Sequence, residues 1–155
     1  MDLSLEHIHP MIVHFPIVLA LVAVLLDLWW IVNSRGGATS ASGANLGTVL
    51  LALAGVSAIF AYIFGDLAYD VAVQKGFSEA QLESHEGWGT ITTVTLVLVA
   101  LLRSFMWWRR LDAAPKGAVA ALGLSLVAAS MVVVTAYFGG HLVYDLGVNV
   151  ASAAG

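Results

Sequence analysis

The chain has 155 residues, of which 60% are hydrophobic and 10% are charged, and its formal net charge is −4. A soluble domain is about half apolar and about a quarter charged, so this chain has too few charges to cover a soluble surface. It has no cysteine, which excludes disulfides, thiolate metal sites, iron–sulfur clusters and covalently attached c-type haem. The composition therefore predicts an integral membrane protein.

Long apolar runs predict four membrane-spanning helices, at about residues 11–32, 46–64, 88–108 and 117–140. Pro10 suits the first turn of the first helix, and Pro16 lies further in and is expected to bend it. Four spans in one short domain predict an all-α integral membrane four-helix bundle with up-down-up-down topology.

The connections between the spans differ in character. Residues 33–45 are small and polar and are expected to form a flexible loop. Residues 65–87 form the longest polar stretch, in which Ser78 followed by Gln81 indicates a capping box for a short helix. That helix is expected to carry His85 and to stop at Gly87.

The basic residues give the bundle an orientation. Arg35, Arg109, Arg110 and Lys116 fall in the two loops on one side, whereas Lys75 falls on the side of the termini. The positive-inside rule makes the two basic loops cytoplasmic. The sequence therefore predicts a multi-pass protein of a bacterial inner membrane with both termini periplasmic.

All five histidines lie on the periplasmic side of this topology. His14 is at the outer end of the first span, His85 enters the third span, and His141 leaves the fourth. Bundle cores commonly hold cofactors between facing helices, and two histidines can bind haem iron from both faces. We take His14 and His85 as the first choice of axial ligands, while His141 and His9 are candidates to replace one of them or to hold a second haem. Three histidines with a carboxylate can instead bind zinc or copper.

Two charges lie deep in the spans. Asp27 is 16 residues past Met11, and Arg103 is 15 residues past Trp88. The first and third spans run in parallel, so the depths of the two side chains agree to within about 2 Å at 1.5 Å rise per residue. We expect a structural ion pair between Asp27 and Arg103 near the cytoplasmic interface.

Motifs spread over nearly the whole chain resemble those of a known family. They are His9-Pro10-x-x-x-His14-Phe15-Pro16, Asp66 after the second span, His85-x-Gly87 before the third, and Gly139-Gly140-x-Leu142-Val143-Tyr144-x-x-Gly147-Val148 at the end. These motifs resemble the bacterial four-span membrane protein family known as domain of unknown function 2231. Some members of that family are fused to, or placed beside, Rieske-type or cytochrome c modules, and the resemblance therefore implies redox work at the outer face.

Together these observations predict a membrane-embedded b-type haem electron-transfer protein with a bis-His haem near the periplasmic face. We expect a subunit of a respiratory or dehydrogenase complex rather than a stand-alone enzyme, in contact with lipid, other membrane subunits and a periplasmic cytochrome or Rieske protein. The alternative is a non-redox structural or copper- or zinc-binding subunit that uses the same outer histidine cluster. A third interpretation is quinone binding by the outer pocket. Nothing in the sequence indicates nucleic-acid binding.

Overall fold

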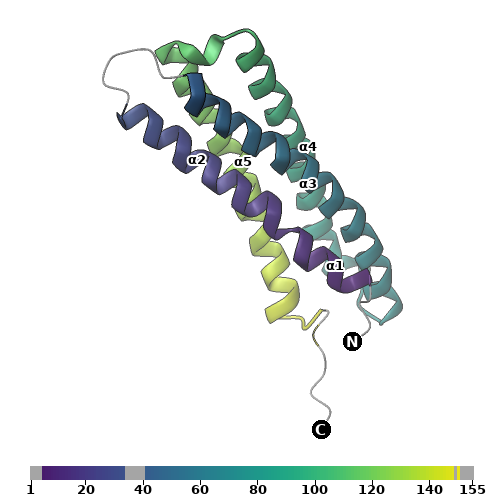
Figure 1. The fold of residues 1–155 in the computed structure, drawn as a ribbon. Helices are drawn as coiled ribbons and strands as arrows, with labels where there is room; N and C mark the ends of the chain where they lie inside the picture. Colours follow the sequence, from purple (N-terminus) through teal and green to yellow (C-terminus); the bar gives the residue numbers. More distant parts are fainter. Residues whose placement is uncertain (1–4, 34–40, 149, 151–155) are drawn as a thin grey trace.

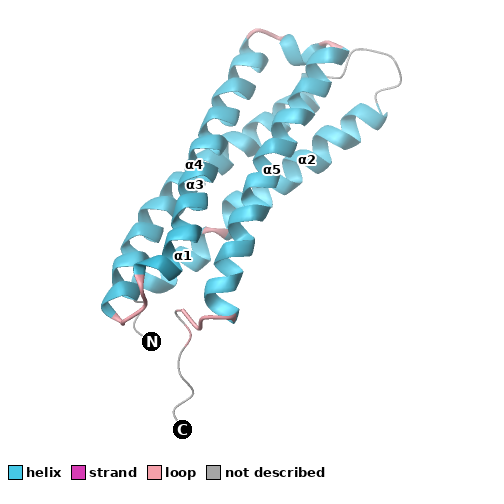
Figure 2. Cartoon of the chain, turned by 180° about the vertical axis from the view of Figure 1, so that it is seen from behind, coloured by secondary structure: helices cyan, strands magenta, loops and turns pink. Residues whose placement is uncertain are grey.

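The computed structural model describes residues 5–33, 41–148 and 150, and it confirms the predicted all-α bundle (Figure 1). The described chain contains no strand and consists of helices joined by short loops (Figure 2). Its helices are, in chain order, α1 (Leu5–Ile12), α2 (His14–Asn33), α3 (Ala41–Gln74), α4 (Glu79–Trp108), the 3₁₀ turn η1 (Leu111–Ala113) and α5 (Pro115–Tyr144).

The four long helices pack in chain order around the bundle. α2 contacts α3, α3 contacts α4, α4 contacts α5, and α5 closes the ring against α2, while the short α1 packs on α3. The start of α1, the α3–α4 turn and the end of α5 lie together at one end, and η1 lies at the other (Figure 1). We call the first the histidine end, because it carries His9, His14, His85 and His141, and the second the arginine end, because it carries Arg103, Arg109 and Arg110.

Four segments are long and apolar enough to cross a membrane. Their outward faces carry large exposed apolar side chains such as Leu25, Leu98 and Val133. Apolar surface on this scale suits contact with lipid rather than water. The four segments are His7–Asn33, Leu46–Gln74, Glu79–Trp108 and Pro115–Tyr144.

Small residues bring the helices close together. The core includes Ala20 and Ala23 of α2, Ala54 of α3 and Ala128 of α5, all fully buried. A Cβ added at Gly55 would lie 3.3 Å from the Cβ of Ala100, so α3 and α4 are in near-backbone contact there. In lipid, helix association depends on such close packing, because the hydrophobic effect does not drive one apolar helix against another.

The first span is interrupted, as the prolines predict. α1 ends at Ile12, Val13 forms a turn, and α2 begins at His14. Pro16 has no N–H to donate to the carbonyl of Ile12, which removes one hydrogen bond of a continuous helix. The break separates α1 from α2 and lets α1 lie against α3.

The connection between the second and third spans is shorter than expected. α3 continues to Gln74 and α4 begins at Glu79, where the Gln81 side chain accepts a hydrogen bond of 3.0 Å from the N–H of Ser78. The predicted stop at Gly87 was wrong, because α4 runs through Gly87 without a break. A glycine inside a helix lowers the stability of the helix by about 1 kcal/mol relative to alanine, and the helical residues on both sides of Gly87 offset this loss. Of the loop predicted at 33–45, residues 34–40 lie outside the described residues and the remainder from Ala41 belongs to α3.

The α4–α5 connection depends on a glycine. A Cβ added at Gly117 would overlap the backbone carbonyl of Leu111 in η1. We expect Gly117→Ala to lower the free energy of unfolding by about 1–3 kcal/mol, because the backbone of η1 must shift. Gly123→Ala in the same helix is the control, since its Cβ would meet nothing within 4 Å. Thermal unfolding in detergent checks this, and equal midpoints for the two variants would contradict it.

Candidate functional site

A cavity of about 520 Å³ lies at the histidine end, lined by residues of α1, α2, α3, α4 and α5. Its volume falls within the range of about 300–1,000 Å³ that is typical of small-molecule and cofactor sites. The lining is mostly apolar, and His9, His14 and His85 are among its polar members. The cavity is therefore the part of the bundle best suited to hold a ligand.

His9 of α1 is held against α3 by two contacts. Its Nδ1 lies 2.9 Å from the carbonyl oxygen of Ala61. A carbonyl oxygen only accepts, so Nδ1 carries the hydrogen, and Nε2 of the neutral ring keeps its lone pair. The Cε1 atom of the ring would lie 3.0 Å from a Cβ at Gly65, so this glycine makes room for the imidazole.

His85 of α4 lies edge-to-face against His9, and both residues line the cavity. The two ring centroids are 6.0 Å apart, and the ring planes are nearly perpendicular, at 79°. A Cβ at Gly139 would lie 2.9 Å from Cε1 of His85, so a glycine of α5 makes room for this ring as well. The Nδ1 atom of His85 is buried and meets no hydrogen-bond partner among the described residues, although the Thr135 backbone is nearby.

The other two candidate ligands have different surroundings. His14 is exposed and its Nδ1 lies 2.6 Å from the carbonyl oxygen of Pro10, so the ring caps the end of α1, although the residue also lines the cavity. His141 is half exposed at the end of α5, where its Nδ1 lies 2.6 Å from Oδ2 of Asp145, and it is not among the residues that line the cavity. The structure thus brings His9, rather than His14 or His141, against His85.

Two threonines of the cavity were missed by the sequence analysis. The hydroxyl groups of Thr92 on α4 and Thr135 on α5 are 2.7 Å apart, and Thr135 also reaches the carbonyl oxygen of Trp88 at 3.0 Å. They link α4 to α5 beside His85, and both line the cavity. Hydroxyl groups in apolar spans often bond across helices, and this is the signal that would have identified them.

The spacing of His9 and His85 has a chemical meaning. A metal ion lies about 2 Å from each imidazole nitrogen that binds it, so two rings that bind one ion from opposite sides have centroids roughly 6 Å apart. An ordinary edge-to-face contact between two rings has a similar spacing, of about 4.5–7 Å. Within the described part of the chain, no group of three or more histidine or carboxylate side chains is placed to hold a metal ion. An iron porphyrin needs two axial ligands from the protein, which is the number of imidazole rings that meet in this cavity.

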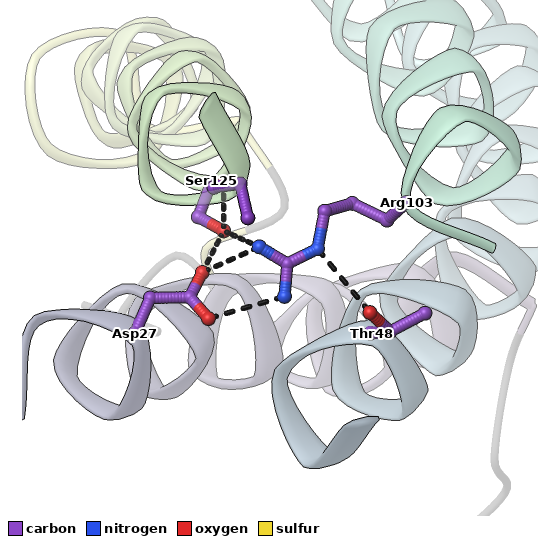
Figure 3. A network of polar contacts seen from close by, with 5 residues as sticks. Asp27, Thr48, Arg103 and Ser125 are labelled. Carbon is purple, nitrogen blue, oxygen red and sulfur yellow. Dashed lines mark hydrogen bonds and ion pairs between the residues drawn. The ribbon is translucent and has the colours of Figure 1, made fainter. Parts of the chain in front are cut away.

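A second polar site lies at the arginine end. Asp27 of α2 and Arg103 of α4 form a bidentate ion pair, with Nη1 to Oδ2 at 2.8 Å and Nη2 to Oδ1 at 3.1 Å (Figure 3). The side chains are 5% and 1% exposed, respectively. The hydroxyl of Ser125 on α5 donates to Asp27, and Nε of Arg103 donates to the hydroxyl of Thr48 on α3 at 3.3 Å. One network thus joins all four long helices.

Gly47 makes room for this network. A Cβ at Gly47 would lie 2.6 Å from Oδ1 of Asp27 and 2.9 Å from Nη2 of Arg103. The carboxylate and the guanidinium neutralise each other and their hydrogen-bonding atoms are occupied, which is the condition for burying two charges. We assign this site a structural role, holding the four helices in register.

The fold and the cavity define a class, a membrane-spanning four-helix bundle with a histidine-lined cavity at one end. Within that class, the family described as "Predicted membrane protein (DUF2231)" matches residues 6–152, and the chain belongs to this family. The resemblance inferred from the sequence motifs is thereby confirmed. Searches of the curated proteins and of the solved structures found no match.

Proposed function

We propose that this protein is a membrane-embedded b-type haem electron-transfer protein in which His9 and His85 are the axial ligands. The observation that carries the proposal is the pair of imidazole rings with centroids 6.0 Å apart in a cavity of about 520 Å³. The His9 ring packs against Gly65 of α3 and the His85 ring packs against Gly139 of α5, and the two histidines come from segments 76 residues apart in the chain. The pairing replaces the first choice from the sequence, in which His14 was the partner of His85.

The number of available ligands favours haem over copper or zinc. Protein sites for zinc use three or four ligands, and copper sites likewise combine several histidines with other donors. In the described chain the cavity offers a close pair of histidines rather than a group of three or more histidine or carboxylate side chains. Two axial histidines are sufficient for haem, because the porphyrin supplies the remaining four nitrogens.

The residues around the pair have definable tasks. The hydrogen bond from Nδ1 of His9 to the carbonyl of Ala61 fixes the ring and leaves Nε2 as the ligand atom. Apolar side chains such as Ala58, Leu96 and Val132 line the cavity and exclude water. Haem, when bound, supplies reversible one-electron chemistry, and burial of this kind is one of the means by which a protein tunes the potential.

The proposal includes a location. Arg109, Arg110 and Lys116 are exposed at the arginine end, and the positive-inside rule assigns that end to the cytoplasm of a bacterial inner membrane. The histidine end then faces the periplasm, where exposed Asp70 and Glu83 suit a basic partner such as a soluble cytochrome. We place the chain in a respiratory or dehydrogenase complex as a subunit.

A visible spectrum tests the proposal directly. The protein is expressed with ample haem supply, purified in detergent, and its dithionite-reduced minus oxidised spectrum is recorded with pyridine haemochrome quantification. Sharp α and β bands at about one haem per chain are the expected result for a low-spin bis-His haem. A preparation without haem would refute the proposal, and elemental analysis for copper and zinc would then test the alternative.

Two adjacent glycines provide a local test of the site. Gly139→Ala would place a Cβ 2.9 Å from Cε1 of His85, whereas the nearest atom to a Cβ at Gly140 is Cδ2 of Tyr144 at 3.9 Å. We expect Gly139→Ala to reduce the haem content at least about threefold or to shift the spectrum to high spin, because the ligand ring must move. Gly140→Ala should retain wild-type haem content. Equal content in the two variants would argue against His85 as a ligand.

A further inference from the structure

Two threonine hydroxyl groups join α4 to α5 at the histidine end. The hydroxyl of Thr92 lies 2.7 Å from that of Thr135 and 3.1 Å from the carbonyl oxygen of Met131. The hydroxyl of Thr135 donates to the carbonyl oxygen of Trp88 at 3.0 Å. Each of these contacts crosses from one helix to the other, so together they fix the distance and the register between α4 and α5.

The same two helix faces meet again at His85. On α4, His85 lies three residues before Trp88, and on α5, Gly139 lies four residues after Thr135. Residues at these spacings share one face of a helix. A Cβ at Gly139 would lie 2.9 Å from Cε1 of His85, so the imidazole packs against the backbone of α5. The contact between His85 and α5 is therefore one helical turn from the contact between Thr135 and Trp88.

The orientation of His85 depends on this packing more than that of His9 does. The Nδ1 atom of His9 bonds to the carbonyl oxygen of Ala61, whereas Nδ1 of His85 meets no hydrogen-bond partner among the described residues. A ring that lacks such a bond is oriented by the groups packed against it, which for His85 include His9 and Gly139. A change in the distance between α4 and α5 would therefore act on His85 first.

We propose that Thr135 is a positioning residue for His85, because its hydroxyl sets the distance between α4 and α5 at which Gly139 supports the imidazole. This inference rests on the proposed function and adds to it a residue that controls how His85 binds iron. The hydroxyl oxygens of Thr92 and Thr135 are 2.7 Å apart. A methyl group in place of one of them needs about 3.5 Å, so it would push the two helices apart by about 1 Å.

Haem titration of Thr135 variants tests the inference. The full chain is purified in detergent from haem-limited cells and titrated with iron protoporphyrin. We expect Thr135→Val to weaken haem binding about 10-fold, since loss of the groups that orient a ligand typically costs about 10- to 100-fold in metal affinity. Thr135→Ser keeps the hydroxyl and should bind haem as the wild type does. Thr90→Val is the matched control, because the exposed hydroxyl of Thr90 bonds to the carbonyl oxygen of Glu86 in its own helix at 3.1 Å.

Measurements on the folded, haem-saturated protein separate positioning from stability. A variant that is only less stable would keep the low-spin spectrum and the midpoint potential of the wild type once it is folded and saturated. A displaced His85 binds iron more weakly and stabilises ferric iron less, so Thr135→Val should show a smaller low-spin fraction and a raised midpoint potential.

Thr135→Ala covers the case in which the valine variant does not fold. Alanine removes the hydroxyl without adding a group that could push the helices apart. We expect it to bind haem about 3-fold more weakly, the effect of one lost hydrogen bond, with a smaller spectral change of the same sign.

The outcomes separate this inference from the proposed function. If the wild-type protein binds no haem, the haem proposal fails and the role of Thr135 fails with it. If the wild type binds haem and Thr135→Val matches Thr90→Val in affinity, low-spin fraction and midpoint potential, haem binding stands and the role of Thr135 is overturned. Wild-type values for Thr135→Ala would overturn it if the valine variant does not fold. A loss for Thr135→Ser equal to that for Thr135→Val would also overturn it, because serine retains the hydroxyl.

Discussion

Replacing Arg103 by methionine is expected to lower the free energy of unfolding by about 3–5 kcal/mol, because it leaves the buried carboxylate of Asp27 without its counter-charge. Asp27 is 5% exposed and accepts two hydrogen bonds from Arg103, and the hydroxyl of Ser125 is the partner that remains. Methionine has a volume similar to that of arginine. The loss in the free energy of unfolding therefore measures the effect of the missing charge rather than the effect of a cavity. Chemical or thermal unfolding in a fixed detergent measures it.

A double variant separates the ion pair from the size of the side chains. Arg103→Met combined with Asp27→Leu removes both charges, and we expect this protein to be more stable than either single variant, since no uncompensated charge stays buried. Arg109→Met is the matched control, because Arg109 is exposed just beyond the end of the same helix. A loss for Arg103→Met no larger than that for Arg109→Met would contradict the structural role of the pair.

The bundle itself was predictable because membrane spans have a strong sequence signal. Four apolar runs of sufficient length leave few arrangements for 155 residues, and short connections make neighbouring helices antiparallel. The helical rise per residue also predicted the buried ion pair. Two residues at equal depth on parallel helices come into contact when their side chains point toward each other. Asp27 and Arg103 met both conditions, and the structure has them in contact.

The helix ends were less predictable. Gly87 is a plausible stop in a polar stretch, but glycine weakens a helix only modestly, and α4 continues through it. Polarity marks where a helix leaves the apolar layer rather than where the helix ends. For this reason α3 runs ten residues past the predicted end at 64, and α4 begins nine residues before the predicted start at 88.

The partner of His85 could not be read from the chain because His9 and His14 lie five residues apart. Which of them points at α4 depends on the break at Val13, which turns α1 onto α3 and directs Nδ1 of His14 to the carbonyl of Pro10. The rotation of a helix about its own axis, and the room made by Gly65 and Gly139, are properties of the packed bundle. Sequence alone therefore gave the set of histidines without the pair.

Four histidine-to-alanine variants distinguish the pair from the other histidines. His9→Ala and His85→Ala are each expected to reduce bound haem at least about tenfold, because each removes one of the two axial ligands that we propose. His14→Ala should keep the low-spin spectrum, since the ring that lies against His85 is that of His9, and His141→Ala should do the same, since that ring pairs with Asp145 away from the cavity lining. Pyridine haemochrome content per purified chain is the measurement.

Added imidazole supplies the control against simple misfolding. If the His85→Ala variant still folds as a four-helix bundle, free imidazole should enter the space left by the missing ring and restore the low-spin bands. An unfolded variant would show no such bands after imidazole is added. Loss of haem in His14→Ala together with its retention in His9→Ala would contradict the pair His9 and His85 and support the pair first inferred from the sequence, His14 and His85.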